Sequence, residues 1–230
     1  MAEFDQYSDR YGAQLERSLG GLASIDLAVR SKLDLLAAIL AETGVESPSR
    51  LLDFGCGTGL LSAHLDRFGA QIIGLDMSLD SLRRSAAPDT DRVAYDGSRI
   101  PLRRDSVDTI VASCVFHHIV PADRQGVLTE LRRILAPDGL LIIIEHNLWN
   151  PVTRWVVNRC EFDADAVLLD RRETARLLET AGFERVAGRY FFTVPPANPA
   201  LRAVDRLLGW SATGAQYCCY GQKPHRPRAA

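Results

Sequence analysis

The sequence is poor in the features that mark several protein classes. Its five cysteines are odd in number and show no CxxC spacing, so they indicate neither a disulfide framework nor a cysteine-based zinc site. No apolar run approaches the roughly 18 residues of a membrane span. The first ten residues, MAEFDQYSDR, are acidic and lack the basic and apolar pattern of a signal peptide. We therefore expect a cytoplasmic protein with no membrane span.

Neither sign of charge is in excess. Lys and Arg number 27 and Asp and Glu number 29, which supplies no broad basic field for a phosphate backbone. We therefore expect no nucleic-acid partner. No set of histidines and carboxylates has the sequence spacing of metal ligands, so no metal site is expected either. The 47% of hydrophobic residues is sufficient for a sizeable core.

From residue 50 onward, short apolar segments alternate with helical ones. The predicted strands are Arg50–Phe54, Gln71–Leu75, Val93–Tyr95, Val107–Ser113, Leu140–Glu145, Arg185–Val194 and Gln216–Gln222. Strands that are apolar throughout and separated by helices predict a parallel sheet covered on both faces. The last two strands follow each other through a partly helical connection, so we expect them to form an antiparallel edge.

Four other segments have their own character. Residues 1–47 carry helical patterns, with Phe4, Tyr7 and Tyr11 on one face, and we interpret them as a helical cap or lid. Residues 146–170 fit no regular element, and a long irregular segment after a strand is often functional. Ala200–Leu208 has apolar residues at helical spacing, which predicts core packing and leaves a homodimer face open. Residues 224–230 read as a flexible tail.

The strongest motif is DFGCGTG, which comprises Asp53, Gly55, Cys56, Gly57 and Gly59 at a strand-to-helix turn. Glycines allow a ligand to approach the backbone, and a helix N-terminus offers unpaired N–H groups. In open α/β sheets, ligands bind outside the carboxyl ends of the strands. We therefore predict a nucleotide-like ligand at this turn.

Acidic residues follow the next two predicted strands. Asp76 ends the second strand, where a carboxylate can accept both hydroxyls of a ribose. Met77 could lie against an adenine ring or simply fill the core. Asp96 and Gly97 end the third strand, where the carboxylate could accept a proton from an adenine amino group or form a solvated turn.

These motifs resemble those of the class I S-adenosylmethionine-dependent methyltransferases. The similar segments are DFGCGTG, GLDMS, YDGSRIPL, SVDTIVASCVFHHI, ELRRILAPDGLLIIIE and TARLLETAGFERV, in order, within a domain of residues 48–223. The resemblance implies a Rossmann-like, mostly parallel seven-stranded sheet with the last strand antiparallel, and S-adenosylmethionine as cofactor. It also implies that Ser113 and an N-terminal tyrosine, Tyr11, contact that cofactor. A dinucleotide-dependent oxidoreductase is disfavoured because it uses GxGxxG, whereas this chain has GxGxG.

The substrate side is expected at the ends of the fourth and fifth strands. His117, His118 and His146 follow these strands, and a histidine can serve as a base near neutral pH. A histidine at the position of His118 is frequent in the resembled family, so it reads equally as a scaffold residue. Within 146–170, Trp149 could wall an apolar pocket.

Charged side chains in the same segment could also bind a substrate. Arg154 and Arg159 could clamp a carboxylate or phosphate. Asp163 and Asp165 could orient an amine or hydroxyl, or Asp163 could pair with Arg159 on a surface helix. These residues favour a small-molecule acceptor, methylated on O, N or C. A non-catalytic S-adenosylmethionine-binding protein, or a protein or RNA methyltransferase with a partner subunit, remains the alternative.

Overall fold

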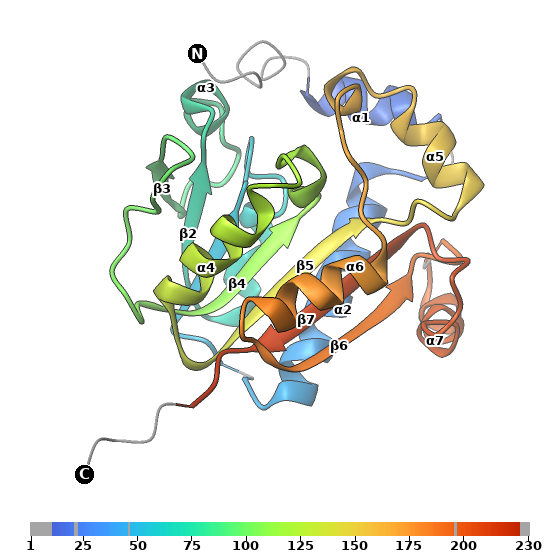
Figure 1. Ribbon diagram of the computed structural model, residues 1–230. Coiled ribbons are helices and arrows are strands. Elements are labelled where there is room, and N and C mark those ends of the chain that lie inside the picture. The colour runs from blue at the N-terminus through green and yellow to red at the C-terminus, as the bar shows by residue number, and fades with distance from the viewer. Residues whose placement is uncertain (1–10, 21–22, 46, 196, 226–230) are drawn as a thin grey trace.

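The computed structural model describes residues 11–20, 23–45, 47–195 and 197–225. Its centre is a seven-stranded sheet in the order β3-β2-β1-β4-β5-β7-β6 (Figure 1). The strands are β1 (Arg50–Phe54), β2 (Gln71–Asp76), β3 (Asp91–Ala94), β4 (Val107–Ser113), β5 (Leu135–His146), β6 (Glu184–Phe191) and β7 (Gln216–Gln222). β1 to β5 pair in parallel, whereas β7 pairs antiparallel with both β5 and β6. The predicted sheet with an antiparallel last strand is therefore confirmed.

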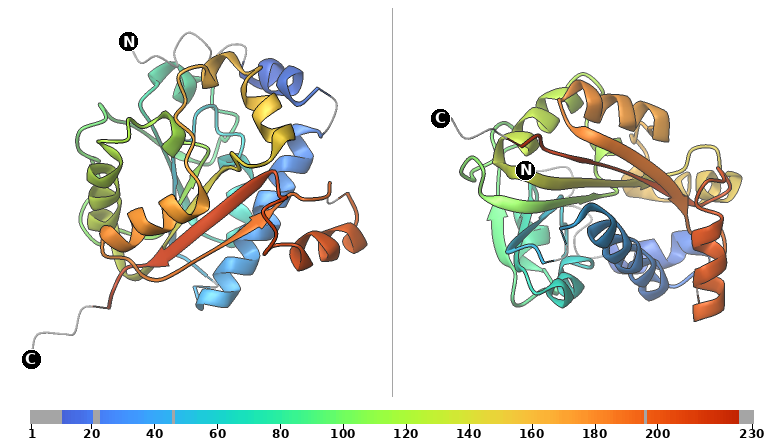
Figure 2. Two further views of the ribbon diagram at one scale, coloured as in Figure 1. Left: turned by 45° about the vertical axis from the view of Figure 1, so that its right-hand side comes forward. Right: turned by 90° about the horizontal axis from the view of Figure 1, so that it is seen from below.

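Helices cover both faces of the sheet, because the central strands are apolar on both sides. α4 (Arg124–Ile134) and α6 (Arg171–Thr180) pack on one face, where Leu128 and Leu178 are fully buried. α2 (Ile25–Thr43) and the 3₁₀ helix η2 (Ser62–Phe68) cover the other (Figure 2). The short α3 (Leu79–Arg83) follows β2, and the Ser78 side chain accepts the Ser81 N–H at its start.

Capping residues define the ends of the long N-terminal helix. Ser24 caps α2 by accepting the Leu27 N–H, and Gly44 ends it with φ of 75°, a conformation that favours glycine. α1 (Tyr11–Leu19) contacts α5 (Pro151–Val157), so the first described helix lies beside the segment that follows β5 (Figure 1). The predicted positions of Phe4 and Tyr7 lie outside the described residues.

Two expectations for the second half of the chain were wrong. Residues 146–170 are not irregular throughout: Asn150 accepts the N–H groups of Val152 and Thr153 and starts α5, and η4 (Glu161–Asp163) follows. Asn at the N-cap followed by Pro at the first helical position favours the start of a helix, even in a segment rich in polar residues. β5 also begins earlier than predicted, at Leu135, because the Pro-Asp-Gly turn is absorbed as an irregularity in its pairing with β4.

α7 (Pro199–Leu207) forms as expected but does not bury its apolar side. Val204 and Leu207 are 43% and 76% exposed, so the prediction of core packing for this helix is wrong. The helix is held instead by Asp205, whose carboxylate accepts the N–H groups of Phe192 and Thr193 just after β6. No helix in the described ranges is long and apolar enough to cross a bilayer.

Candidate active site

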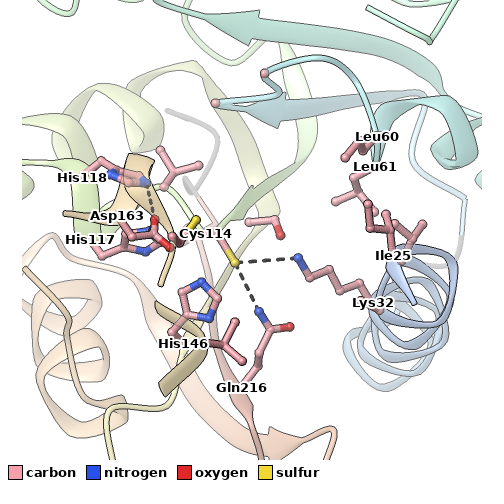
Figure 3. A pocket seen from close by; sticks show the side chains of 18 of the residues that line it. Ile25, Lys32, Leu60, Leu61, Cys114, His117, His118, His146, Asp163 and Gln216 are labelled. Carbon is pink, nitrogen blue, oxygen red and sulfur yellow. Dashed lines mark hydrogen bonds and ion pairs between the residues drawn. The ribbon is translucent and has the colours of Figure 1, made fainter. Parts of the chain in front are cut away.

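A cavity of about 520 Å³ opens at the carboxyl ends of β1, β2, β4 and β5. Its walls come from parts of the chain that are far apart, including Lys32 on α2, the glycine turn after β1, Thr153 and Val156 on α5, and Gln216 at the start of β7. Figure 3 shows side chains from these elements pointing toward a common centre. The cavity has the size and position at which α/β proteins bind small ligands.

The glycine turn after β1 has one open position. Gly55, Gly57 and Gly59 all adopt positive φ, at 72°, 52° and 75°. A Cβ at Gly55 would lie 2.5 Å from Val115 Cγ2, and one at Gly59 would collide with the Ser85 hydroxyl. A Cβ at Gly57 would meet no atom within 4 Å. Gly55 and Gly59 therefore allow close packing, whereas Gly57 leaves room for a ligand against its backbone.

Asp76 joins this turn to the end of β2. Its carboxylate accepts the Gly57 N–H at 2.7 Å and the Ser78 N–H at 2.8 Å. Two backbone donors fix the carboxylate at the cavity wall. The acid predicted for ribose binding is thus held in place by the glycine motif itself.

Asp53 is a buried acid beneath the turn. It is 2% exposed and accepts the Ser62 hydroxyl at 2.5 Å. Burial raises its pKa to about 6, with the Ser62 bond and Lys32 opposing that shift. A buried carboxylate at a ligand cavity can accept a hydrogen bond from the ligand or pair with a positive charge on it.

The cofactor residues predicted from sequence divide into two groups. The residues that line the cavity are Asp53, Gly55, Cys56, Gly57, Asp76, Met77 and Ser113. Gly59, Asp96 and Gly97 do not line it. Asp96 instead accepts the N–H and hydroxyl of Ser98, which forms a tight exposed turn and lowers its pKa. Tyr11 begins α1, and its side chain lies outside what the structure describes.

His117 is held from behind by a buried carboxylate. Its Nδ1 lies 2.5 Å from Glu145 Oε2, and Glu145 Oε1 accepts the N–H groups of Val115 and Phe116. Burial disfavours the imidazolium, but Glu145 and Asp163 outweigh it and raise the pKa of His117 to about 10. Burial works against ionisation of Glu145 too, but His117 and the two backbone donors lower its pKa. The pair is therefore a buried ion pair.

The three predicted histidines gather at one side of the cavity. The ring centre of His117 lies 4.1 Å from that of His118 and 5.2 Å from that of His146 (Figure 3). The gathering follows from the topology, because β4 and β5 are neighbours and end at the same edge.

Cys114 forms a second polar group with His146. Its Sγ lies 3.7 Å from Lys32 Nζ and 3.2 Å from Gln216 Nε2 (Figure 3). Burial would raise the pKa of the thiol, but Lys32 and His146 outweigh burial and lower it to about 6. The thiolate in turn raises the pKa of His146 against the effect of burial. A cysteine thiolate thus faces the cavity beside a histidine.

The aromatic and basic residues predicted to bind substrate lie elsewhere. Trp149 is 66% exposed, and Arg154 and Arg159 do not line the cavity. Arg159 stacks over Trp155 instead, at 4.7 Å from the ring centre, and does not pair with Asp163. On α5, Thr153 and Val157 turn toward the interior, whereas Arg154 and Trp155 face outward.

Several residues of the site were missed at the level of sequence. Lys32 lies on α2 beside a second cation, Arg30, so no local signal in the sequence distinguishes it as a cavity residue. Glu145 and Gln216 lie inside predicted strands and have no distinguishing pattern. Asp163 was singled out, but its partners are His117 and His118 from a segment about 45 positions earlier. A spacing rule for metal ligands could not detect this cluster, because the chain supplies its members from two separate turns.

Comparison with known proteins finds similarity to methyltransferases. Residues 52–143 match the family model of a methyltransferase domain. Demethylmenaquinone methyltransferase of Mycolicibacterium paratuberculosis is 27% identical over 146 residues, which cover 58% of this chain and 63% of that protein. The chain spans less than two thirds of the length of the curated relatives it matches, from 39% to 64% for six of them.

Two solved structures share the fold over nearly the whole chain. A SAM-dependent methyltransferase of Thermotoga maritima, described as a possible histamine N-methyltransferase, superposes with a TM-score of 0.71 at 19% identity, covering 96% of this chain and 98% of that one. A putative methyltransferase of Haloferax volcanii, solved in complex with the activator Trm112, gives a TM-score of 0.64 at 23% identity, covering 98% and 99%. At these identities the likeness establishes the fold.

Proposed function

We propose that this protein is an S-adenosylmethionine-dependent methyltransferase that acts on a small molecule, because residues 52–143 match a methyltransferase domain and the chain has the fold of such enzymes. The observation that carries the proposal is a single cavity with two different walls. One wall holds Asp76 and the open backbone of Gly57, which suit a nucleoside. The other holds a cysteine, histidines and a lysine, which suit proton transfer and acceptor binding.

The residues of the first wall fit S-adenosylmethionine. Asp76 would accept the ribose hydroxyls, Gly57 would give the ligand access to its backbone, and Met77 would lie beside the adenine. Asp53 would attract the positively charged end of the ligand from beneath the turn. When bound, the cofactor supplies a methyl group already activated on a sulfonium, so the protein's main task is to align the acceptor with it.

The Cys114–His146 pair is the best proton acceptor in the cavity. His117 is committed to a buried ion pair with Glu145, which makes it a poor base. Cys114 and His146 each shift the pKa of the other, and both face the cavity with Lys32 beside them. An acceptor hydroxyl or ammonium held in the cavity would pass its proton to this pair, and bound S-adenosylmethionine would supply the methyl group.

Calorimetric titration with S-adenosylmethionine tests the first part of the proposal. Asp76→Ala should weaken binding about 10- to 100-fold, because it removes a charged acceptor for two hydroxyls. Asp80→Ala, on the exposed side of α3, is the matched control and should bind as the parent does. NADH should not bind. Binding of NADH in place of S-adenosylmethionine would contradict the assignment.

Formation of S-adenosylhomocysteine in the presence of small metabolites tests the second part. If the cofactor binds and no acceptor in a broad panel is methylated, the result would favour a non-catalytic S-adenosylmethionine-binding protein. The activator-bound Haloferax volcanii neighbour gives a reason to consider a partner-dependent enzyme as well. A subunit that co-purifies in a fixed ratio and restores turnover would favour that alternative over a free-standing small-molecule enzyme. A homodimer and a cytoplasmic location stay predictions.

A further inference from the structure

Three side chains at one side of the cavity have the arrangement of a metal site. His117 and His118 belong to the 3₁₀ turn η3 (Phe116–His118), and Asp163 belongs to η4. One ligand atom from each lies within 4.8 Å of the others. Asp163 Oδ1 is 3.4 Å from His117 Nε2 and 3.3 Å from His118 Nε2 (Figure 3).

These separations suit a small divalent ion. A tetrahedral ion with bonds of about 2.05 Å holds its ligands about 3.35 Å apart. Two imidazole nitrogens and one carboxylate oxygen form the set used by catalytic zinc and by non-haem iron sites with open positions. Exposed acidic clusters are common without a metal, but Asp163 is only 8% exposed and His117 only 1%.

The surroundings orient one ligand for this purpose. Glu145 fixes Nδ1 of His117, which leaves Nε2 directed toward Asp163. Nε2 is buried, and no hydrogen bond of acceptable geometry reaches it within the described part of the chain. A carboxylate behind the far nitrogen of a ligating histidine is the usual outer-shell partner in metal sites. Glu145 is itself fixed by the N–H groups of Val115 and Phe116.

From this geometry we propose that His117, His118 and Asp163 bind one divalent transition-metal ion, which displaces the Nε2 proton of His117, with Glu145 as a positioning residue. The three ligands all line the cavity, so the remaining coordination positions face the space for the acceptor. A metal there would hold an oxygen or nitrogen donor of the acceptor in place. That last role rests on the proposed methyltransferase function, whereas metal binding itself does not.

The test is cobalt and zinc titration of the tag-free, EDTA-treated protein without S-adenosylmethionine. We expect one ion per chain, and visible absorption of bound Co²⁺ typical of a four- or five-coordinate site. Asp163→Asn and His118→Ala should each abolish stoichiometric binding. Glu145→Gln should weaken the affinity about 10- to 100-fold while the stoichiometry stays at one.

Matched variants separate this site from other candidates. Asp165→Asn, on an exposed residue two positions from Asp163, should bind the metal as the parent does. Cys114→Ser should also retain it, because the thiol is outside the proposed ligand set. Circular dichroism checks that each variant is folded, and Asp163→Glu, which keeps a carboxylate, should recover part of the affinity.

The outcomes are distinct from those of the function test. No stoichiometric binding of Co²⁺ or Zn²⁺, or binding that survives both Asp163→Asn and His118→Ala, would overturn the metal site even if S-adenosylmethionine binds. Stoichiometric metal binding in a protein that fails to bind S-adenosylmethionine would support the site and contradict the methyltransferase proposal instead.

Discussion

Glu145 and His117 form a buried pair that ties the end of β5 to the turn after β4, with both side chains 1% exposed. Glu145→Gln would leave the His117 charge without its partner in a dry environment. We expect the free energy of unfolding to fall by about 3 kcal/mol. Urea unfolding at pH 7 measures this, with Glu179→Gln on the exposed side of α6 as the control. An equal, small effect in both variants would show that the pair contributes nothing special to stability.

The buried carboxylate of Asp53 is expected to lower the free energy of unfolding at neutral pH, although we expect it to help to bind the cofactor. Burial raises its pKa to about 6, so the folded protein holds this proton more tightly than the unfolded chain does. The contribution of this bound proton to the free energy of unfolding is fully present below about pH 3.8, and it is lost as the pH rises through about 6. Asp53→Asn keeps an acceptor for Ser62 and should stabilise the protein at pH 7 by about 2 kcal/mol. Calorimetry should show the same variant binding S-adenosylmethionine more weakly.

The control for that prediction is its pH dependence. The parent should lose stability between pH 4 and 7 relative to Asp53→Asn, and the two curves should converge at low pH. Parallel curves would mean that Asp53 does not titrate in this range.

Cys114 should react with alkylating agents at a pH where ordinary thiols do not. Burial would raise its pKa, but Lys32 and His146 lower it to about 6, so the thiolate prevails at pH 7. Iodoacetamide labelling followed by mass spectrometry should show a rate with its midpoint near pH 6. Cys56 also faces the cavity, but burial raises its pKa strongly, and it should stay unlabelled at pH 7. Lys32→Met should move the Cys114 midpoint upward, and an unchanged midpoint would contradict the electrostatic origin.

The glycines of the motif should differ in what their loss costs. At Gly59, an added Cβ meets the Ser85 hydroxyl and the Ala87 side chain, so Gly59→Ala should destabilise the fold by about 2–3 kcal/mol. At Gly57 the space is open, and alanine should cost only about 1 kcal/mol of backbone strain. Gly57→Ala should instead reduce affinity for S-adenosylmethionine. Thermal unfolding together with calorimetric titration separates the two effects, and equal stability losses would contradict the assignment.

The acceptor should contact the inner side of α5 and not its basic residues. Val156→Phe adds bulk at the cavity wall and should raise the KM for the acceptor about 10-fold or more. Arg154→Ala, on the opposite side of the same helix, should leave that KM within about twofold. Steady-state kinetics on the identified acceptor checks both. A larger effect from Arg154 would restore the anion-clamp interpretation of the sequence.

Much of the framework is predictable from sequence because its signals are local. Apolar runs mark β1, β2 and β4 directly in the sequence, and glycines mark the turn after β1. Asp76 ends β2 as expected. Ligand placement at the strand ends then follows from the rules of parallel sheets. The same rules predict that His117, His118 and His146 share one edge of the sheet, because each follows the end of a parallel strand.

The second wall of the cavity could not be predicted, because long-range packing creates it. Lys32 and Gln216 are 184 positions apart in the chain, yet both reach Cys114. Asp163 meets His117 only because η4 folds back over η3, a contact that no spacing in the sequence encodes. The aromatic and basic residues on and beside α5 misled the substrate prediction for a related reason: composition does not reveal which side chains of such a segment face inward.

The position of β7 has a consequence for how the protein is made. β7 lies between β5 and β6 in the sheet, although it follows both of them in the chain. While ribosomes synthesise the polypeptide, β5 must therefore wait as an open, apolar edge, a kind of surface that promotes wrong pairing with other chains. Gln216, at the start of that last strand, also completes the cavity. The sheet closes and the binding site is completed in the same late step. An unfinished chain can therefore aggregate through its open edge before it can bind any ligand.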